Sequence, residues 1–221
     1  PKMHFINDKS NILETKINSQ LPIGDLSSLF IKKTSDLKNY SNKYINSDPI
    51  RSNELKKHLK KKGQIICGLS WISKNEDIGA SKSISLDILK PVLSLENIKF
   101  VDIQYNDTTA EREQFFLENN INVLKFEDID SFHDIDGITS LIDACDFIIT
   151  VSNTNAHIAG ALGKKTILLL PKGKGRLWYW TSNKNKSTWY SSIQIIEQSF
   201  PGEWEPVIHK LKKIVRGFIS E

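Results

Sequence analysis

The segment 152–157 carries side chains that suit the binding of an anion. It reads Ser-Asn-Thr-Asn-Ala-His and stands where a helix is expected to begin. Free backbone N–H groups and the positive end of the helix dipole favour a phosphate at such a position, and short hydroxyl and amide side chains add donors. The candidate ligands here are Ser152, Asn153, Thr154 and His157. The alternative is a plain helix cap followed by a packed histidine.

A second candidate segment, 171–176, reads Pro-Lys-Gly-Lys-Gly-Arg and precedes Trp178-Tyr179-Trp180. Lysine and arginine attract phosphate, glycine lets the backbone approach a ligand closely, and aromatic rings can stack on a sugar or a base. Lys172 and Gly173 are the candidates from this segment. A surface loop without a ligand is the alternative.

A third segment follows the first apolar run of the sequence. Ser70 and Trp71 end that run, and Lys82 stands just before the next helical pattern. This segment again combines hydroxyl groups with a cation. If the three segments meet at one edge of the fold, their natural ligand is a small molecule that carries a diphosphate.

The elements that must position these segments alternate regularly. Apolar runs typical of buried strands cover residues 65–69, 98–103, 122–126, 147–151, 166–170 and 193–196. Helical patterns cover residues 85–95, 109–119, 138–145, 154–162 and 203–218. This alternation predicts right-handed βαβ units and an α/β fold with an open, doubly wound parallel sheet. Ligands of such sheets bind at the carboxyl ends of the strands, which is where the three segments lie.

The first 62 residues differ from the rest in their hydrophobic pattern. They are polar and irregular, except for a helix that Asp48 caps, that Pro49 begins and that ends at Gly63. We expect residues 1–62 to be a short N-terminal extension: the remnant of a preceding domain plus a linking helix. Residues 63–221 then form the domain that holds the sheet. The chain begins with Pro rather than Met, which favours a piece of a longer protein.

Composition excludes several classes of protein. The chain has 221 residues, of which 39% are hydrophobic and 25% charged, as in soluble globular proteins. No apolar run approaches the ~18 residues of a membrane span. Cys67 and Cys145 are far apart and suit core packing in a reducing, cytoplasmic setting. The net charge of +4 accompanies a general preference for lysine, so we expect no nucleic-acid partner.

The sequence offers little for metal or nucleophilic chemistry. The histidines are scattered without metal-ligand spacing, and the Asp-x-Asp pairs at 128/130 and 134/136 read as acidic solvated loops. We expect no metal and no cofactor. The Gly-x-Ser-x-Gly elbow of hydrolases and the Gly-x-Gly-x-x-Gly fingerprint of dinucleotide binding are absent. No residue qualifies as a general base, so the catalytic residues stay unknown.

At this point the residues resemble a known family. They are the run Gly68-Leu69-Ser70-Trp71, residues 82–86, Gln104, residues 151–164, residues 169–171 and residues 189–192. Together they look like the C-terminal, donor-binding domain of GT-B glycosyltransferases. The most similar members are bacterial proteins in which such a domain follows tetratricopeptide repeats, akin to heptosyltransferases and to the O-linked N-acetylglucosamine transferase. The resemblance covers residues 21–215, and 157–163 is its most specific part.

The resemblance implies that residues 63–221 bind a nucleotide-diphosphate sugar without a metal. Ser70 and Lys82 would face the diphosphate, and Gln104 would face the donor. Ser152, Asn153, Thr154 and His157 would surround the phosphates and the sugar. An N-terminal tetratricopeptide-repeat or acceptor domain in the parent chain would supply the acceptor site, for a protein or a glycan, and the catalytic base.

One departure from the family concerns the transferred sugar. Heptosyltransferases have Asp-Thr where this chain has Ser152-Asn153, so the carboxylate expected beside the sugar is missing. Two readings therefore stay open. The first is a glycosyltransferase domain of a longer two-domain enzyme, and the second is a non-catalytic nucleotide-binding or protein-interaction module that keeps the fold.

Overall fold

The computed structural model describes residues 21–33, 36, 43–60, 63–183 and 185–219. The chain divides into two compact units, Pro1–Tyr40 and Ser41–Glu221. In the first unit, the described residues form the short helix α1 (Ile23–Leu26) and the 3-10 turn η3 (Ser27–Leu29). Every residue discussed below belongs to the second unit.

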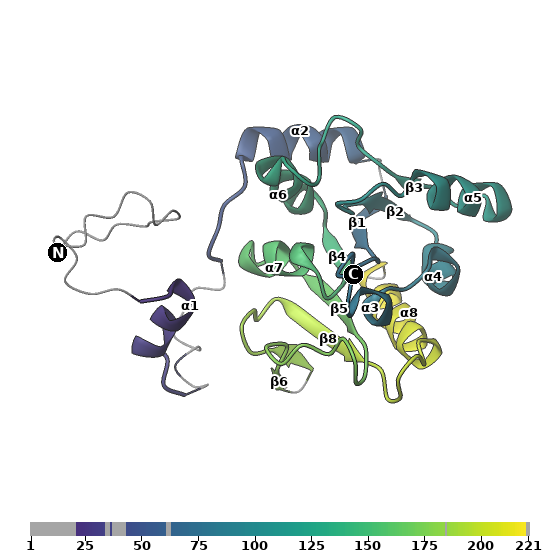
Figure 1. Cartoon of the computed structure of the whole chain (residues 1–221). Helices are drawn as coiled ribbons and strands as arrows, with labels where there is room; N and C mark the ends of the chain where they lie inside the picture. Colours follow the sequence, from purple (N-terminus) through teal and green to yellow (C-terminus); the bar gives the residue numbers. More distant parts are fainter. Residues whose placement is uncertain (1–20, 34–35, 37–42, 61–62, 184, 220–221) are drawn as a thin grey trace. The chain divides into compact units, whose positions relative to one another are not determined.

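The second unit is built on a sheet whose described strands follow the order β3-β2-β1-β4-β5-β8-β7-β6 (Figure 1). The strands are β1 (Ile65–Ser70), β2 (Ile98–Asp102), β3 (Val123–Leu124), β4 (Phe147–Val151), β5 (Thr166–Leu170), β6 (Ser182–Asn183), β7 (Lys186–Ser187) and β8 (Ile193–Glu197). The first six strands in this order, from β3 through β8, pair in parallel. The remaining two, β7 and β6, extend the sheet beyond β8 in antiparallel pairing. The strand order reverses between β1 and β4. The predicted doubly wound parallel sheet is thus confirmed.

Helices cover both faces of the sheet. They are α2 (Pro49–Leu59), α3 (Gly79–Lys82), α4 (Leu86–Leu93), α5 (Thr109–Asn119), α6 (Ile135–Ala144), α7 (Thr154–Ala161) and α8 (Glu205–Ile219). One core forms between the sheet and α4, α5 and α8, and another forms between the sheet and α2, α6 and α7 (Figure 1). Because both faces are covered, the central strands are apolar throughout rather than alternating.

Local sequence explains where the helices begin. Asp48 caps α2 by accepting hydrogen bonds from the backbone N–H groups of Ile50 and Arg51, as its sequence context predicts. Asp134 caps α6 in the same manner, and Asn153 caps α7. The elements that the sequence did not predict include α1, η3, α3 and the pair β6 and β7. Each has four or fewer residues, too short for a recognisable hydrophobic period.

The helix α2 packs within the second unit, against α6. Leu59 at its end is fully buried, and Ser52 Oγ donates a hydrogen bond to the carbonyl of Ser140 at 3.2 Å. Arg51 forms an ion pair of 2.7 Å with Asp134, the residue that caps α6. The linking helix is therefore an integral part of this unit. The proposed domain boundary at residue 62 stays a prediction.

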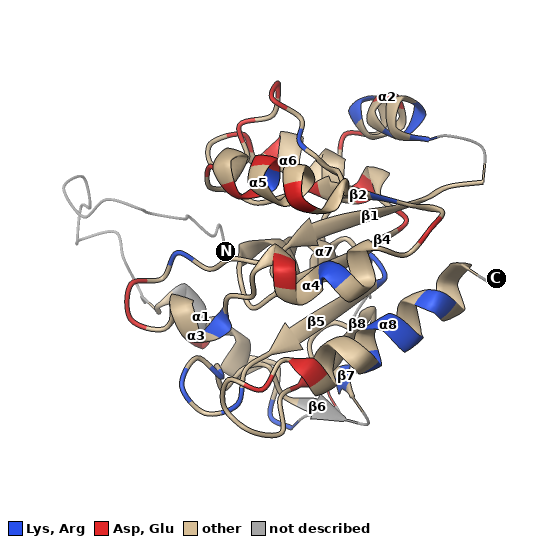
Figure 2. Cartoon of the chain, turned by 90° about the vertical axis from the view of Figure 1, so that its right-hand side faces the viewer, with Lys and Arg blue, Asp and Glu red and all other residues tan. Residues whose placement is uncertain are grey.

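Charged residues are unevenly spread over the helices. Figure 2 shows lysine and arginine along α8 and on α2, and acidic residues on α5 and α6. The basic side of α8 faces solvent because its other side, with Val207, Leu211 and Val215, is buried against the sheet. Among the helices that the structure describes, none combines the length and the apolar character needed to cross a membrane.

Candidate functional site

The carboxyl ends of β1 and β4 are joined by a buried polar network. Asn153 Nδ2 donates to Ser70 Oγ at 2.6 Å, and Ser70 Oγ donates to Gln104 Oε1 at 2.6 Å. Gln104, which is fully buried, also accepts from the backbone N–H of Ile72 at 3.0 Å. Three of the predicted residues, Ser70, Gln104 and Asn153, therefore meet. Much of their hydrogen-bonding capacity is used inside the protein, to hold the two loops together.

The loop after β5 joins the same edge through two contacts. Trp180 Nε1 donates to Ser152 Oγ at 2.8 Å, and both residues are buried. Gly175, at φ +90°, lies so close to α3 that a Cβ atom there would stand 3.0 Å from Lys82 Cγ. Only glycine combines that backbone conformation with so close an approach. The three segments singled out in the sequence thus come together at one edge of the sheet.

Lys82 is the most unusual side chain at this edge. Only 5% of it is exposed, yet it forms no ion pair or hydrogen bond with any residue in the described part of the chain. Burial lowers the pKa of its ammonium group. Its Nζ is not one of the buried unpartnered atoms among the described residues, so the stem is covered while the ammonium group reaches solvent at this edge. An anionic ligand would supply the missing partner.

The amino-terminal end of α7 presents an unused hydroxyl group. Asn153 is the cap, since its side chain accepts from the backbone N–H of Asn155 at 3.1 Å. Thr154, the first helical residue, is exposed, and its hydroxyl bonds to no described residue. Asn155 is buried, and its Nδ2 donates to the carbonyl of Ile103 at 2.6 Å. The sequence analysis did not single out this structural role of Asn155.

His157 lies one turn later, within a cluster of aromatic rings. Its Nδ1 stands 3.2 Å from the hydroxyl of Tyr190, and its ring stacks on Trp180 at 4.6 Å between centroids. The ring of Tyr179 lies 5.4 Å away. Burial lowers the pKa of His157, which favours the neutral imidazole. The side chain is part exposed, so one side of it remains open to a ligand.

Lys172 and Gly173 lie at the outer part of the loop that follows β5. Both are exposed, and Gly173 has φ +72°. Lys172 Nζ stands 3.9 Å from Glu197 Oε1, whereas Arg176 Nε stands 3.1 Å from the same oxygen. Arg176 also donates to the carbonyl of Trp180 at 2.6 Å, so it holds the loop in shape. Lys172 is the cation with more freedom to reach a ligand.

Trp71 points into the protein rather than toward the edge. It is 1% exposed and packs in the core beside α4 and α5. Its indole N–H donates to Glu111 at 3.0 Å, and the other oxygen of Glu111 accepts from the backbone N–H of Leu86 at 3.2 Å. The structure therefore does not bring the Trp71 ring together with the other predicted residues.

A charged cluster that the sequence analysis missed stands at the end of β2. Asp102 is fully buried, and it lies 3.3 Å from Arg112 Nε and 3.6 Å from Lys125 Nζ. Thr108 donates a further hydrogen bond to it. Burial raises the pKa of Asp102, and the two cations oppose that rise. An aspartate at the end of an apolar run was the visible signal, but the spacing along the chain did not reveal its partners.

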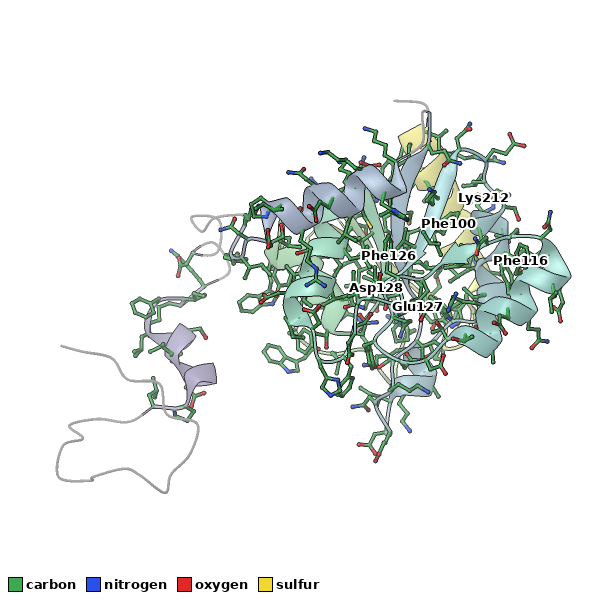
Figure 3. All side chains as sticks on the ribbon, turned by 90° about the horizontal axis from the view of Figure 1, so that it is seen from above. Phe100, Phe116, Phe126, Glu127, Asp128 and Lys212 are labelled. Atoms are coloured by element: carbon green, nitrogen blue, oxygen red, sulfur yellow. The ribbon has the colours of Figure 1, made fainter. Side chains whose placement is uncertain are left out.

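A cavity of about 250 Å³ adjoins this cluster at the carboxyl ends of β2 and β3. Its lining includes Gln104, Thr108, Arg112, Lys125 and Glu127. Figure 3 shows Glu127 and Asp128 together in the loop after β3, while Phe116 projects outward from α5. A larger cavity of about 320 Å³ lies at the opposite ends of the strands, beside Thr166 and Phe218. None of the predicted site residues lines that second cavity, so the first is the one relevant here.

The acidic pairs noted in the sequence do not converge. Asp128 is exposed, Asp130 bonds to His133 Nδ1 at 2.8 Å, and Asp134 pairs with Arg51. The hydrogen bond from His133 and those from two backbone N–H groups lower the pKa of Asp130 to about 2. Within the described residues, no group of three or more His, Cys, Asp or Glu side chains is placed to hold a metal ion. Metal independence stays a prediction.

Comparison with known proteins shows where this fold occurs. Protein FlbA of Caulobacter vibrioides is 28% identical over 182 residues, which cover 81% of this chain and 30% of that protein. The E. coli ADP-heptose LPS heptosyltransferase II has a similar structure, with a TM-score of 0.54 and 12% identity over 85% of this chain and 58% of that one. A family 9 glycosyltransferase from Veillonella parvula gives a TM-score of 0.55 and 11% identity over 88% of this chain and 50% of that one. No protein-family model matches the sequence.

The second unit therefore has a Rossmann-like α/β fold that it shares with GT-B glycosyltransferases. At these identities the likeness concerns the fold alone. The chain spans 30% of the curated relative, and 58% and 50% of the two solved structures.

Proposed function

We propose that this chain is the donor-binding part of a glycosyltransferase and binds a nucleotide-diphosphate sugar without a metal. The diphosphate lies at the carboxyl ends of β1, β4 and β5, between Lys82, the beginning of α7 and the loop 172–174. In this arrangement Ser70, Gln104, Asn153 and Ser152 build the floor of the site. Lys82, Thr154, His157 and Lys172 make the contacts with the ligand.

One observation carries the proposal: the stem of Lys82 is covered by the protein, while its ammonium group reaches solvent and has no partner among the described residues. A lysine whose stem is held in this way presents its ammonium group to solvent at a fixed place. Here the stem packs under Gly175, and Gly175 belongs to the loop that carries Lys172 and Lys174. A diphosphate would neutralise these charges together, whereas a neutral ligand would leave Lys82 unpaired.

The beginning of α7 supports an anion at the same place. Backbone N–H groups and the helix dipole favour negative charge there, and Thr154 offers a hydroxyl that the cap does not use. The beginning of α7 and Lys82 lie at the same edge of the sheet, because the loop after β5 contacts both Ser152 and Lys82. In the transfer reaction these groups stabilise the charge that develops on the leaving diphosphate.

The cavity at the ends of β2 and β3 suits the nucleoside of the donor. It shares Gln104 with the network beneath the proposed diphosphate site, and its volume of about 250 Å³ is lined mainly by polar side chains. Arg112, Lys125 and Asp102 hold one another in place next to it. We assign no particular base or sugar to the donor.

The acceptor and the general base belong, in this proposal, to another domain of a longer enzyme. The solved structures with this fold are about twice as long as the part that this chain matches, and the curated relative is longer still. No carboxylate occupies the positions of Ser152 and Asn153 beside the proposed sugar. A module that binds a nucleotide sugar without transferring it is the competing function.

Binding is tested by titrating the 221-residue chain with ADP, GDP, UDP and CDP, with and without EDTA. We expect one of them to bind equally well in both conditions. At 100 times its dissociation constant it should stabilise the fold by about 2.7 kcal/mol. Absence of binding by all four, or binding that EDTA abolishes, contradicts the proposal. Release of free nucleoside diphosphate from the sugar form by the parent protein then separates a transferase from a binding module.

A further inference from the structure

We infer that Tyr190 is a positioning residue that keeps His157 in the tautomer with its proton on Nε2, so that Nε2–H donates to the bound donor. This inference rests on the proposed function, because it gives His157 a ligand to which it can donate. The role of Tyr190 itself, however, concerns the unliganded protein and can be measured there.

The two ring nitrogens of His157 have different surroundings. Nδ1 lies 3.2 Å from the hydroxyl of Tyr190, so the two atoms share a hydrogen bond. Nε2 has no hydrogen-bond partner among the described residues, and it is not one of their buried unpartnered atoms, so it reaches solvent. The ring itself cannot turn freely, because it stacks on Trp180 with an angle of 23° between the planes. The open nitrogen is therefore the one available to a ligand.

In this inference the hydroxyl of Tyr190 donates the shared hydrogen bond to Nδ1 of His157. Burial raises the pKa of Tyr190, so the phenol keeps its proton at neutral pH. Its only acceptor among the described residues is Nδ1 of His157. If Nδ1 carried the proton instead, the phenolic proton would have no acceptor among the described residues and would have to donate to water from a half-buried place, which is less favourable. The neutral imidazole then carries its single proton on Nε2.

Two neighbours hold the Tyr190 ring against α7. A Cβ atom at Gly160 would stand 2.5 Å from Tyr190 Cγ and 2.7 Å from Cδ1, so the absence of a side chain at Gly160 makes room for the ring. On another side the ring of Tyr44 makes an edge contact, with 6.2 Å between centroids. Tyr44 is held in turn by a 2.7 Å hydrogen bond from its backbone N–H to the carbonyl of Ala161, at the end of α7.

No charged group competes with Tyr190 for control of His157. The rings that face His157 are those of Tyr179, Trp180 and Tyr190, with Tyr44 behind Tyr190. In the described part of the chain, no carboxylate or ammonium group pairs with His157. The tautomer is therefore set by one neutral hydrogen bond, and removal of a single oxygen atom should release it.

The test uses Tyr190→Phe, which keeps the ring and removes the hydroxyl, with Tyr44→Phe as the matched control. Tyr44 also loses a hydroxyl, but its hydroxyl bonds to the carbonyl of Trp189 and not to His157. The tautomer of His157 is read from two-bond ¹H–¹⁵N NMR spectra of each 221-residue protein. The affinity for ADP and for UDP is measured by calorimetry at pH 7.5, and circular dichroism checks the fold.

We expect the Nε2–H form alone in the wild type and in Tyr44→Phe, and a mixture of tautomers in Tyr190→Phe. The dissociation constant of the nucleotide that binds should rise about threefold to tenfold in Tyr190→Phe only. The Nδ1–H form in the wild type overturns the inference, even if Tyr190→Phe does not fold. Equal weakening by both variants, or an unchanged tautomer in Tyr190→Phe, also overturns it. If neither nucleotide binds the wild type, the proposed function fails, and the NMR result still decides the role of Tyr190.

Discussion

Asn153 Nδ2 donates a 2.6 Å hydrogen bond to Ser70 Oγ, although 83 residues separate the two along the chain. The bond ties the end of β1 to the beginning of α7 at the point where the strand order of the sheet reverses. Open α/β sheets bind their ligands at this point, because the loops diverge there and leave a crevice. The contact therefore defines the floor of the candidate site.

Lys82→Met should abolish most nucleotide binding without destabilising the protein. A charge-assisted hydrogen bond to phosphate contributes about 1.5–3 kcal/mol, so the dissociation constant should rise roughly 10- to 150-fold. Because burial lowers the pKa of Lys82, the folded state binds this proton more weakly than the unfolded state does. Removal of the ammonium group should then leave the melting temperature unchanged or higher.

Lys90→Met, at an exposed position of α4, is the control for general charge loss. A fall in melting temperature for Lys82→Met would mean that its ammonium group has a partner inside the protein.

The two residues at the beginning of α7 should separate stability from binding. Asn153→Ala removes the helix cap and the bond to Ser70, and should lower the free energy of unfolding by about 1–2 kcal/mol. Thr154→Ala changes an exposed side chain without a partner in the described structure, and should change stability by less than about 0.5 kcal/mol. Its nucleotide affinity should nevertheless fall about threefold to tenfold. Urea denaturation and calorimetry measure both quantities, and unchanged affinity in Thr154→Ala removes it from the site.

Acid should destabilise the wild type more than His157→Gln. Burial lowers the pKa of His157 in the folded state below its ordinary value of about 6.5. The unfolded chain therefore takes up this proton first as the pH falls below about 6.5, and stability is lost between that value and the folded pKa. Melting temperatures measured from pH 7.5 to pH 5 should fall more steeply in the wild type. His209→Gln, on the exposed side of α8, is the control and should follow the wild type.

Gly160→Ala should destabilise the protein because it forces the Tyr190 ring to move. The new Cβ atom would lie 2.5 Å from that ring, and overpacking of this kind costs about 1–3 kcal/mol. Gly217→Ala in α8 is a matched control, since no heavy atom lies within 4 Å of its Cβ position. That variant should gain about 0.5–1 kcal/mol from helix propensity. Denaturant midpoints for the pair should move in opposite directions, and a gain in both would show that the Tyr190 ring is loosely held.

Asp102→Ala should be among the most damaging single substitutions in this domain. It leaves Arg112 and Lys125, both largely buried, without their shared carboxylate. Breaking a buried ion pair from one side costs about 3 kcal/mol or more. Asp128→Ala, in the exposed loop nearby, should change stability by no more than about 0.5 kcal/mol. Similar midpoints for the two variants in urea denaturation would show that the Asp102 cluster contributes little.

Much of the fold could be read from the amino-acid sequence alone. The apolar runs 147–151 and 166–170 coincide with β4 and β5, because a parallel strand buried on both faces needs apolar residues at every position. The start of α2 was equally readable, since Asp48 and Pro49 satisfy or remove the free N–H groups of a helix end locally. Alternation of such elements predicted an open parallel sheet, and with it the edge at which a ligand would bind, whereas the strand order came from the structure. These features depend on neighbours within a few residues.

Only the tertiary structure decided which side chains at that edge are available to a ligand. Ser70 and Trp71 are adjacent in sequence, yet one joins the polar network and the other lies in the core, because the alternation of side chains along β1 continues into the first residue after it. Among the described residues Lys82 has no partner, whereas Asp102 is paired with Arg112 and Lys125 and accepts further hydrogen bonds, for the same kind of reason. Each depends on loops that meet it from distant parts of the chain, and sequence spacing contains no information about those contacts.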